Sequence, residues 1–214
     1  MYTLHWFPGN ANLTPHMLLE ELGVPFSLSL VDRADNAQRS AAYLALNPHG
    51  RIPTLVDHQF DQLVVYETAA ICLHLVDQHA EAGLAPAVGT AARARFYQWM
   101  MYLTNTVQTE MHPYFYPERH VADPAAAADV KATAERRLAG MFDAMELQLS
   151  DGPYVLGDDL SVADHFLFML TRWTRNMTRP ARTLPNLGRH AERMWARPAV
   201  KRAFATEGLG APYY

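Results

Sequence analysis

The chain has 214 residues, of which half are hydrophobic and 19% are charged, and its formal net charge is −4. A chain of this length buries roughly 70% of its unfolded surface, so it needs no metal or disulfide in order to fold. Its single cysteine, Cys72, excludes an internal disulfide and suits a reducing compartment. Neither a signal-peptide pattern nor an apolar run of roughly 18 residues is present, so we expect a cytoplasmic protein with no membrane partner.

Apolar periodicity and turn residues predict an α/β arrangement in the first part of the chain. Strands are predicted over residues 2–7, 26–31, 54–56 and 63–65. Helices are predicted over residues 12–21, 37–46 and 67–79, the first of them beginning at Asn12. This order predicts a mixed four-stranded sheet, in which a helical crossover joins the first two strands and a hairpin joins the last two.

Residues 80–88 follow no pattern and include Gly83 and Pro86, so they are interpreted as a linker between domains 1–79 and 89–214. Strand signals almost vanish beyond the linker, which predicts an all-α helical bundle. Its helices are expected over residues 89–116, 124–149, 161–177, 185–196 and 198–206.

Positive charge is concentrated near the end of the chain. Residues 172–202 hold nine of the 18 cations, and Glu192 is their only acid. Such a stripe can bind nucleic acid. However, the isoelectric point is about 6.2 and few aromatic residues lie among the arginines, which favours a solvated helical face. We therefore expect no nucleic-acid partner.

The segment Arg51-Ile52-Pro53-Thr54 places a proline at the mouth of a short strand, which indicates a sheet edge or an irregular site. If the bond before Pro53 is cis, the backbone groups of Ile52 face outward and can pair with an extended peptide. The alternative is an ordinary trans proline, because only about 5–6% of X–Pro bonds are cis.

Glu67 and Thr68 lie at the start of a predicted helix, where free N–H groups and the helix dipole favour an anion. The Thr68 hydroxyl can add a donor to that anion, and the Glu67 carboxylate can hold an ammonium group. An α-amino acid head group offers this pair of charges. The alternative is a plain helix cap with an acid in the first turn.

Ser161 and Asp164 have the spacing of a reciprocal capping box. The residues that follow, from Phe166 to Trp173, are apolar almost all round, which predicts a buried helix. We assign this motif a role in folding and not in catalysis.

Taken together, these motifs resemble the glutathione transferase superfamily, and most closely its bacterial beta class. The resemblance covers nearly the whole chain and rests on residues in register, namely Phe7-Pro8-Gly9 through Pro15-His16, Asn47 through Pro53, Glu67-Thr68, Leu160 through Asp164, and Arg197 through Val200. It implies a thioredoxin-like domain that holds glutathione, followed by a helical domain that accommodates a second substrate. It also implies a homodimeric detoxification enzyme.

The resemblance also implies roles for individual residues. Ile52 would pair with the cysteinyl backbone of glutathione, with Pro53 cis, while Glu67 and Thr68 would hold the γ-glutamyl head. The remaining candidates are Arg51 or His49 for the glycine carboxylate, with Arg33 and Arg39 as weaker ones, and Asn105 and His112 on a helix beside the site. His112 would hydrogen-bond the sulfur or a leaving group, unless it is simply a surface or core histidine.

The chain departs from the beta class at two neighbouring positions, Ala11 and Asn12, the second of which replaces a beta-class serine. Beta-class members place a cysteine where this chain has Ala11, and Cys72 lies in an apolar helix. The neighbouring amides, Asn12 and Asn10, are therefore candidates to stabilise the thiolate, although Asn12 has the alternative role of capping its helix. One hydrogen bond to a charged group supplies roughly 1.5–3 kcal/mol, and lowering a thiol pKa by two units requires about 2.7 kcal/mol.

Transferase chemistry on a small hydrophobic electrophile is therefore the leading function, with glutathione as the co-substrate and no metal. A glutathione-dependent disulfide or peroxide reductase and a non-catalytic glutathione carrier are the alternatives. A Met- and Tyr-rich wall is predicted for the electrophile, and the alternative is that half of its residues form core between the domains. The wall consists of Trp99, Met101, Tyr102, Met111, Tyr114, Phe115, Tyr116 and Phe166.

Overall fold

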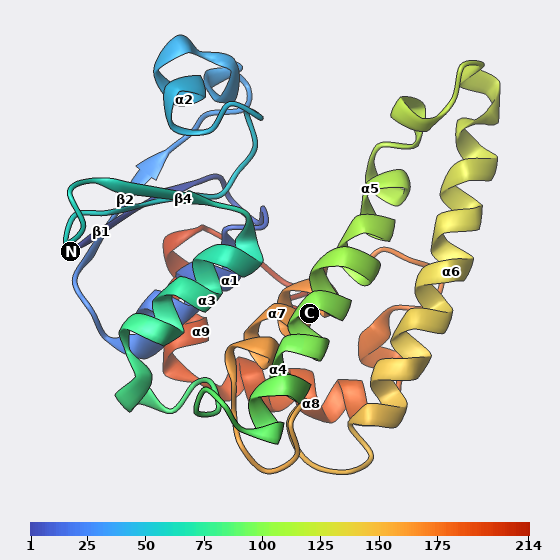
Figure 1. The fold of residues 1–214 in the computed structure, drawn as a ribbon. Coiled ribbons are helices and arrows are strands. Elements are labelled where there is room, and N and C mark those ends of the chain that lie inside the picture. Colours follow the sequence, from blue (N-terminus) through green and yellow to red (C-terminus); the bar gives the residue numbers. More distant parts are fainter. The chain divides into compact units, whose positions relative to one another are not determined.

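The computed structural model describes residues 1–214, which form two compact units. Unit 1 comprises Met1–Ala85 together with Trp195–Tyr213, and unit 2 comprises Pro86–Met194 together with Tyr214. Figure 1 shows the elements of each unit. Unit 1 thus contains a helix from the far end of the chain, which the sequence groups with the second domain.

Unit 1 is built on a four-stranded mixed sheet. Its strands are β1 (Tyr2–Trp6), β2 (Phe26–Leu30), β3 (Thr54–Asp57) and β4 (Leu63–Tyr66), and their order in the sheet is β2-β1-β3-β4. Strands β1 and β2 are parallel, whereas β3 is antiparallel to both β1 and β4. The predicted crossover and hairpin are therefore confirmed.

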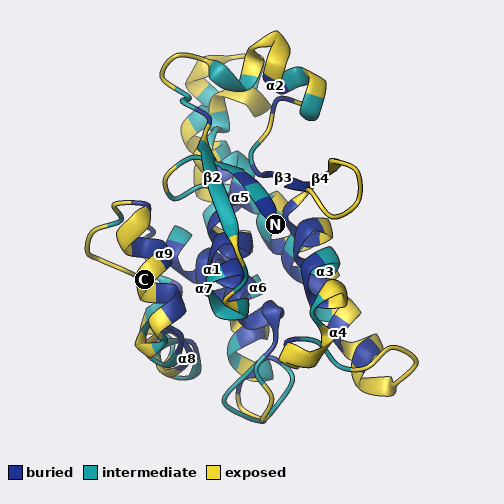
Figure 2. Cartoon of the chain, turned by 90° about the vertical axis from the view of Figure 1, so that its left-hand side faces the viewer, coloured by how far each residue is buried: buried dark blue, intermediate teal, exposed yellow.

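Four helices accompany this sheet, namely α1 (Leu13–Leu22), α2 (Ala41–Leu46), α3 (Thr68–Gln78) and α9 (Pro198–Thr206). Helices α1 and α3 cover one face of the sheet and α2 lies on the other, while α9 packs against α1 (Figures 1 and 2). The helix predicted over 37–46 is interrupted, because the Ser40 side chain accepts a 3.2 Å hydrogen bond from the Tyr43 N–H and starts α2 afresh. A 3₁₀ turn, Ala37–Arg39, precedes it.

Unit 2 is helical, as predicted. Its helices are α4 (Ala91–Met101), α5 (Thr109–Phe115), α6 (Ala127–Gln148), α7 (Val162–Trp173) and α8 (Pro185–Ala196), the last of which continues into unit 1. Short 3₁₀ turns lie at Pro117–His120, Pro124–Ala126 and Ala181–Thr183. A π-helical segment, Tyr102–Gln108, joins α4 to α5 within the stretch predicted as one helix.

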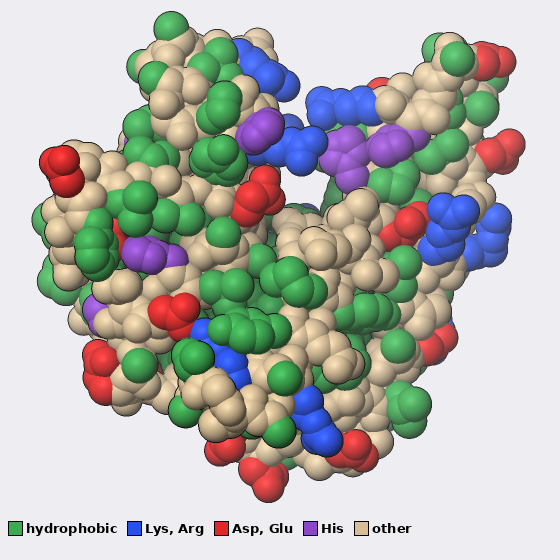
Figure 3. Space-filling view, viewed as in Figure 1, with side chains coloured by type: hydrophobic (Ala, Val, Ile, Leu, Met, Phe, Trp, Pro, Cys, Tyr) green, Lys and Arg blue, Asp and Glu red, His purple; other side chains and the backbone are tan.

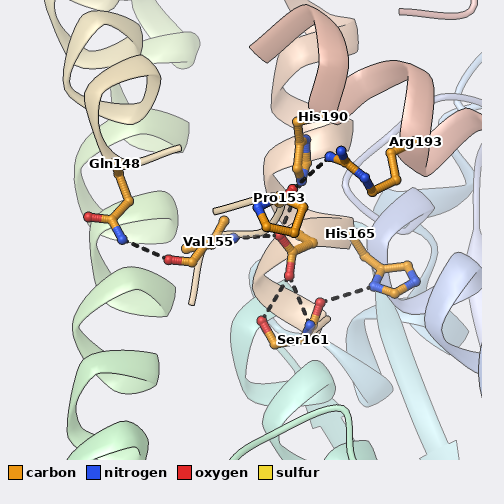
Figure 4. Close-up of polar contacts among 8 residues, drawn as sticks. Gln148, Pro153, Val155, Ser161, His165, His190 and Arg193 are labelled. Carbon is orange, nitrogen blue, oxygen red and sulfur yellow. Dashed lines mark hydrogen bonds and ion pairs between the residues drawn. The ribbon is translucent and has the colours of Figure 1, made fainter. Parts of the chain in front are cut away.

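Helix α7 is the buried centre of unit 2: every residue from Val162 to Arg172 is buried (Figure 2). The predicted capping box is present at its start. The carboxylate of Asp164 accepts hydrogen bonds from the Ser161 N–H at 2.8 Å, the Val155 N–H at 2.8 Å and the His190 ring at 3.1 Å (Figure 4). One buried carboxylate therefore ties α7 to α8 and to the loop before α7.

Five of the nine cations of residues 172–202 contact other segments of their own unit. Three of them pair with acids, Arg179 with Asp143, Arg197 with Glu21, and Arg202 with Glu20. Others donate to main-chain carbonyls, Arg182 to Tyr214 and Arg193 to Pro153. These contacts fasten helices and loops together within each unit.

Candidate active site

The loop after β1 carries Asn10 and Asn12, the two side-chain amides that the sequence predicts as candidates to stabilise the thiolate. Asn12 is fully buried: its Oδ1 accepts a 3.0 Å hydrogen bond from the Phe7 N–H, and its Nδ2 donates to Glu207 Oε1 at 2.8 Å. Its side chain makes no capping bond to α1, so the alternative in which Asn12 caps this helix is wrong. The amide is used to shape the loop, which leaves it poorly suited to binding a thiolate.

Asn10 is different. It is half-buried, and its side-chain amide makes no hydrogen bond to any other group of the chain. Its backbone carbonyl accepts a 3.0 Å bond from the Leu13 N–H at the start of α1. Asn10 is therefore the amide of this loop that can donate to a ligand.

Glu207, which the sequence does not single out, holds this loop from the end of α9. Its Oε2 accepts a 2.8 Å bond from the Gly9 N–H, and its Oε1 accepts 2.8 Å bonds from Asn12 and from His16 Nδ1. Glu207 is only 3% exposed, and a buried carboxylate is tolerated only when it is paired and hydrogen-bonded. The loop therefore depends on a residue almost 200 positions away, a distance at which no spacing motif signals it.

Neither position 11, where beta-class members have a cysteine, nor Cys72 supplies a reactive thiol. Ala11 is 8% exposed and contributes a methyl group. Cys72 is completely buried in α3, and burial raises the pKa of its thiol far above the ordinary value. The chain therefore has no thiolate of its own at neutral pH.

The segment before β3 presents an open edge of main chain. The Ile52–Pro53 peptide bond is cis. The Arg51 carbonyl accepts hydrogen bonds from the Tyr43 hydroxyl at 2.6 Å and from Asn47 Nδ2 at 2.9 Å, so α2 fixes its position. The N–H and C=O of Ile52 take part in none of the hydrogen bonds of the chain. They can therefore pair with an extended peptide.

The start of α3 offers an anion site. Three N–H groups of its first turn, those of residues 68–70, have no partner within the helix, as is general for helix N-termini. Glu67 is exposed and has a φ of 73°, a value that residues other than glycine rarely adopt. Its carboxylate makes no capping bond and remains open to solvent.

Thr68 departs from the expected role in one respect. Its hydroxyl donates to the Ala11 carbonyl at 3.3 Å and is buried, so it links α3 to the loop after β1 instead of serving as an open donor. The Thr68 N–H remains the donor at this position. The same contact brings the start of α3 beside the loop that carries Asn10.

Basic side chains lie near this edge of unit 1. Arg39 donates to the His49 carbonyl at 3.4 Å, the His49 ring packs edge-on against Tyr66 at 5.6 Å, and Arg51 is exposed. Figure 3 shows cationic and histidine side chains together on this surface, over α2 and the segment after it. Arg51 and His49 are therefore available to an anion, whereas Arg39 is partly used to position the loop.

Unit 2 contains Asn105 and His112, the two remaining residues that the sequence predicts for the site. Asn105 is exposed in the π-helical segment, with Nδ2 at 3.9 Å from Met101 Sδ. His112 is half-buried in α5, and its Nδ1 lies 2.8 Å from Nε2 of His120. The helical segment that carries Asn105 bonds i to i+5, as a π-helix does, whereas His112 lies in the α-helical turn pattern of α5.

The predicted hydrophobic wall is only partly accessible. Met111, Tyr114 and Phe166 are buried core, whereas Met101 and Phe115 are exposed. Trp99, Tyr102 and Tyr116 lie between these extremes. A cavity of about 320 Å³ in unit 2 lies elsewhere, between α6 and residues 177–184, with Phe142, Met177 and Leu184 in its lining.

Comparisons with known proteins agree with this arrangement. The family model for the glutathione S-transferase N-terminal domain matches residues 13–78, and that for the C-terminal domain matches residues 105–207. Together these two matches cover most of the chain. The chain belongs to the glutathione S-transferase family.

Individual relatives of this glutathione S-transferase family member are similar over their full length. The glutathione S-transferase GstA of Escherichia coli O157:H7 is 28% identical over 96% of this chain and 98% of its own. A glutathione transferase homologue from Sulfitobacter, solved with bound glutathione, has a TM-score of 0.88 and 30% identity, covering 98% of this chain and 99% of that one. A sphingomonad glutathione S-transferase complexed with glutathione has a TM-score of 0.85 and 30% identity, over 97% and 100%.

No helix is both long enough and apolar enough to cross a membrane. No group of three or more His, Cys, Asp or Glu side chains is placed to hold a metal ion.

Proposed function

We propose that this protein is a glutathione transferase, in which the thiolate of bound glutathione attacks a small hydrophobic electrophile. The observation that carries the proposal is the open main chain of Ile52 in the same unit as the unpartnered N-terminus of α3. An extended peptide with an α-amino acid head group matches both features. The bound glutathione in the two structural relatives supports the choice of that peptide.

Each part of glutathione has a candidate partner. The cysteinyl backbone pairs with Ile52, beside Pro53. The γ-glutamyl carboxylate lies against the N–H groups at the start of α3, including that of Thr68, while the Glu67 carboxylate holds the ammonium group. Arg51 or His49 meets the glycine carboxylate.

Asn10 is the candidate that faces the sulfur. A free thiol with a pKa near 8.5 is only about 3% thiolate at pH 7, so the site must favour the anion. A hydrogen bond from the Asn10 amide supplies roughly 1.5–3 kcal/mol, and the N-terminus of α1 adds about 0.3–1 kcal/mol. The sum reaches the roughly 2.7 kcal/mol that a shift of two pKa units requires. Asn12 is left out of this role because its amide is committed to Glu207.

The reaction itself is a displacement. The glutathione thiol releases its proton to solvent, the sulfur forms a bond to the electrophilic carbon, and a leaving group such as chloride departs with the electron pair of its bond. Positioning of the two reactants supplies much of the acceleration. His112 donates a hydrogen bond to the sulfur or to the leaving group, with Asn105 as a further polar contact, and a homodimer is the proposed assembly.

The test is an assay of the purified protein with glutathione and a chlorodinitrobenzene, followed by one with hydroxyethyl disulfide. The proposal expects turnover of the aryl halide. Turnover of the disulfide alone would favour a glutathione-dependent reductase. A thermal shift with millimolar glutathione but no turnover in either assay would favour a glutathione carrier. The absence of any thermal shift would show that the protein does not bind glutathione and would contradict the proposed site.

A further inference from the structure

Two histidines of unit 2 form a hydrogen-bonded pair on its surface. His112 belongs to α5 and His120 ends the 3₁₀ turn that follows, and their facing nitrogens, Nδ1 and Nε2, are 2.8 Å apart. The other histidines of this unit, His165 and His190, are buried. Figure 3 shows histidine side chains on the surface of the molecule.

The local chain explains how residues eight positions apart meet. Helix α5 ends before Tyr116, and Pro117 begins the 3₁₀ turn. The turn is closed by a 3.0 Å bond from the Arg119 N–H to the Tyr116 carbonyl, and the Arg119 guanidinium lies 4.4 Å from the centre of the Tyr116 ring. The Tyr116 ring in turn lies 5.1 Å from that of His112. The turn thus carries His120 back beside α5.

This pair constrains where the proton of His112 resides. Two neutral imidazoles form a hydrogen bond only when one N–H lies between them. If His120 donates, the Nδ1 of His112 is the acceptor and its proton is on Nε2. If His120 accepts, the proton of His112 is on Nδ1 and Nε2 becomes an acceptor. The hydrogen-bond partner of one ring nitrogen therefore decides whether the other ring nitrogen is a donor or an acceptor.

We propose that His120 is a positioning residue that donates its Nε2–H to His112 and so holds His112 in the tautomer with the proton on Nε2. This inference rests on the proposed function, in which His112 donates a hydrogen bond to an anionic sulfur or leaving group. Only the Nε2–H tautomer of neutral His112 offers that donor, since its Nδ1 is occupied by His120. His120 itself need not touch either substrate.

Three substitutions of His120 separate this role from a structural one. The amide of His120→Gln keeps a donor, the carboxylate of His120→Glu can only accept, and His120→Leu does neither. We expect the kcat/KM of His120→Gln to stay within about threefold of the wild type and that of His120→Leu to fall about tenfold. His120→Glu should fall about 100-fold, because it draws the proton to Nδ1 and leaves an acceptor at Nε2. Equal losses in all three variants, or full activity of His120→Leu, would overturn the proposal.

A spectroscopic measurement tests the tautomer independently of turnover. Long-range ¹H–¹⁵N NMR of the imidazole rings, with His112→Asn used for assignment, should place the proton of His112 on Nε2 in the wild type and in His120→Gln, and on Nδ1 in His120→Glu. A wild-type protein with the proton on Nδ1 would refute the positioning role even if the enzyme is active. If no electrophile is turned over, the proposed function fails, whereas the NMR result still decides the tautomer.

A double-substitution cycle links the two residues. In a His112→Ala background, where the acceptor is gone, His120→Leu and His120→Glu should cause no further loss of activity. An additional loss of the same size as in the wild-type background would show that His120 acts elsewhere, and would overturn the proposal.

Discussion

The carboxylate of Glu207 accepts a 2.8 Å hydrogen bond from the side chain of Asn12, although 195 positions separate the two residues in the chain. The same carboxylate holds the Gly9 N–H and His16, so a single buried group at the end of α9 sets the shape of the loop after β1. The conformation of the proposed glutathione site thus depends on the last helix of the chain.

Replacement of Glu207 by glutamine should destabilise unit 1. Glutamine keeps the shape of the side chain but removes its charge. Its amide NH₂ group would also face the N–H groups that the carboxylate now accepts from, so we expect a loss of about 1–3 kcal/mol in the free energy of unfolding. Urea unfolding measures it. Glu20→Gln is the matched control, because the Glu20–Arg202 pair is on the surface and should contribute less than about 1 kcal/mol. Equal losses in both variants would contradict the role of Glu207.

The two amides of the first loop should respond differently to alanine. Asn10→Ala is expected to lower kcat/KM by about 10- to 100-fold, which corresponds to the roughly 1.5–3 kcal/mol of one charge-assisted hydrogen bond, while its unfolding free energy stays the same. It should also raise the pKa of bound glutathione, measured by the ultraviolet absorbance of the thiolate against pH. Asn12→Ala should lose stability first, because it leaves the Phe7 N–H and Glu207 short of partners. Full activity of Asn10→Ala would show that Asn10 does not stabilise the thiolate.

Stability should decline in mild alkali because of Cys72. Its thiol pKa is raised by burial, so the folded state keeps this proton while the unfolded state loses it above roughly pH 8.5. Since the folded state then binds more protons, its stability falls by up to about 1.4 kcal/mol per pH unit above that value. The difference in unfolding free energy between pH 8 and pH 9.5 should be smaller in Cys72→Ala than in the wild type, with reductant present. If the unfolding free energy of Cys72→Ala depended on pH in the same way as that of the wild type, the raised pKa of the buried thiol would be contradicted.

Cys72→Ala has a second expected outcome. Its activity with an aryl halide at pH 7 should match that of the wild type, because a buried, protonated thiol takes no part in the reaction. A loss of activity without a loss of stability would instead assign a chemical role to Cys72.

Gly50, just before the open edge at Ile52, should tolerate no side chain. Its φ is 58°, and a Cβ there would lie 2.7 Å from the Gln38 carbonyl oxygen. Gly50→Ala should therefore cost more than the roughly 1–2 kcal/mol of the left-handed conformation alone, and should raise the KM for glutathione. Gly23 has a φ of 65° with nothing within 4 Å of its added Cβ, so Gly23→Ala isolates the conformational term. A smaller loss in Gly50→Ala than in Gly23→Ala would refute the steric argument.

Local signals predicted much of the fold. The helix over 185–196 has the expected bounds, because Pro185 can start a helix, and Pro198 marks the start of α9 in the same way. The mixed sheet followed from the order of strands and helices. These features depend on residues close together in sequence, where period and turn chemistry are informative.

Features that depend on distant contacts were not predicted. The capping role of Asn12 was wrong because Glu207 and the Phe7 N–H take both ends of its amide. The π-helical segment Tyr102–Gln108 was not predicted either, because the apolar pattern contained no sign of it. The site roles of Ile52, Glu67 and Arg51 stay predictions, whereas the structure shows what surrounds each of them.

The dependence of the first loop on α9 has a practical consequence for fragments of the protein. A polypeptide ending at residue 85 would lack the acceptor for Gly9, Asn12 and His16 and would expose the side of α1 that α9 covers. Such a truncation should be unstable and prone to self-association. An independently folding version of unit 1 would have to be produced by splicing residues 195–213 onto that fragment through a new connection.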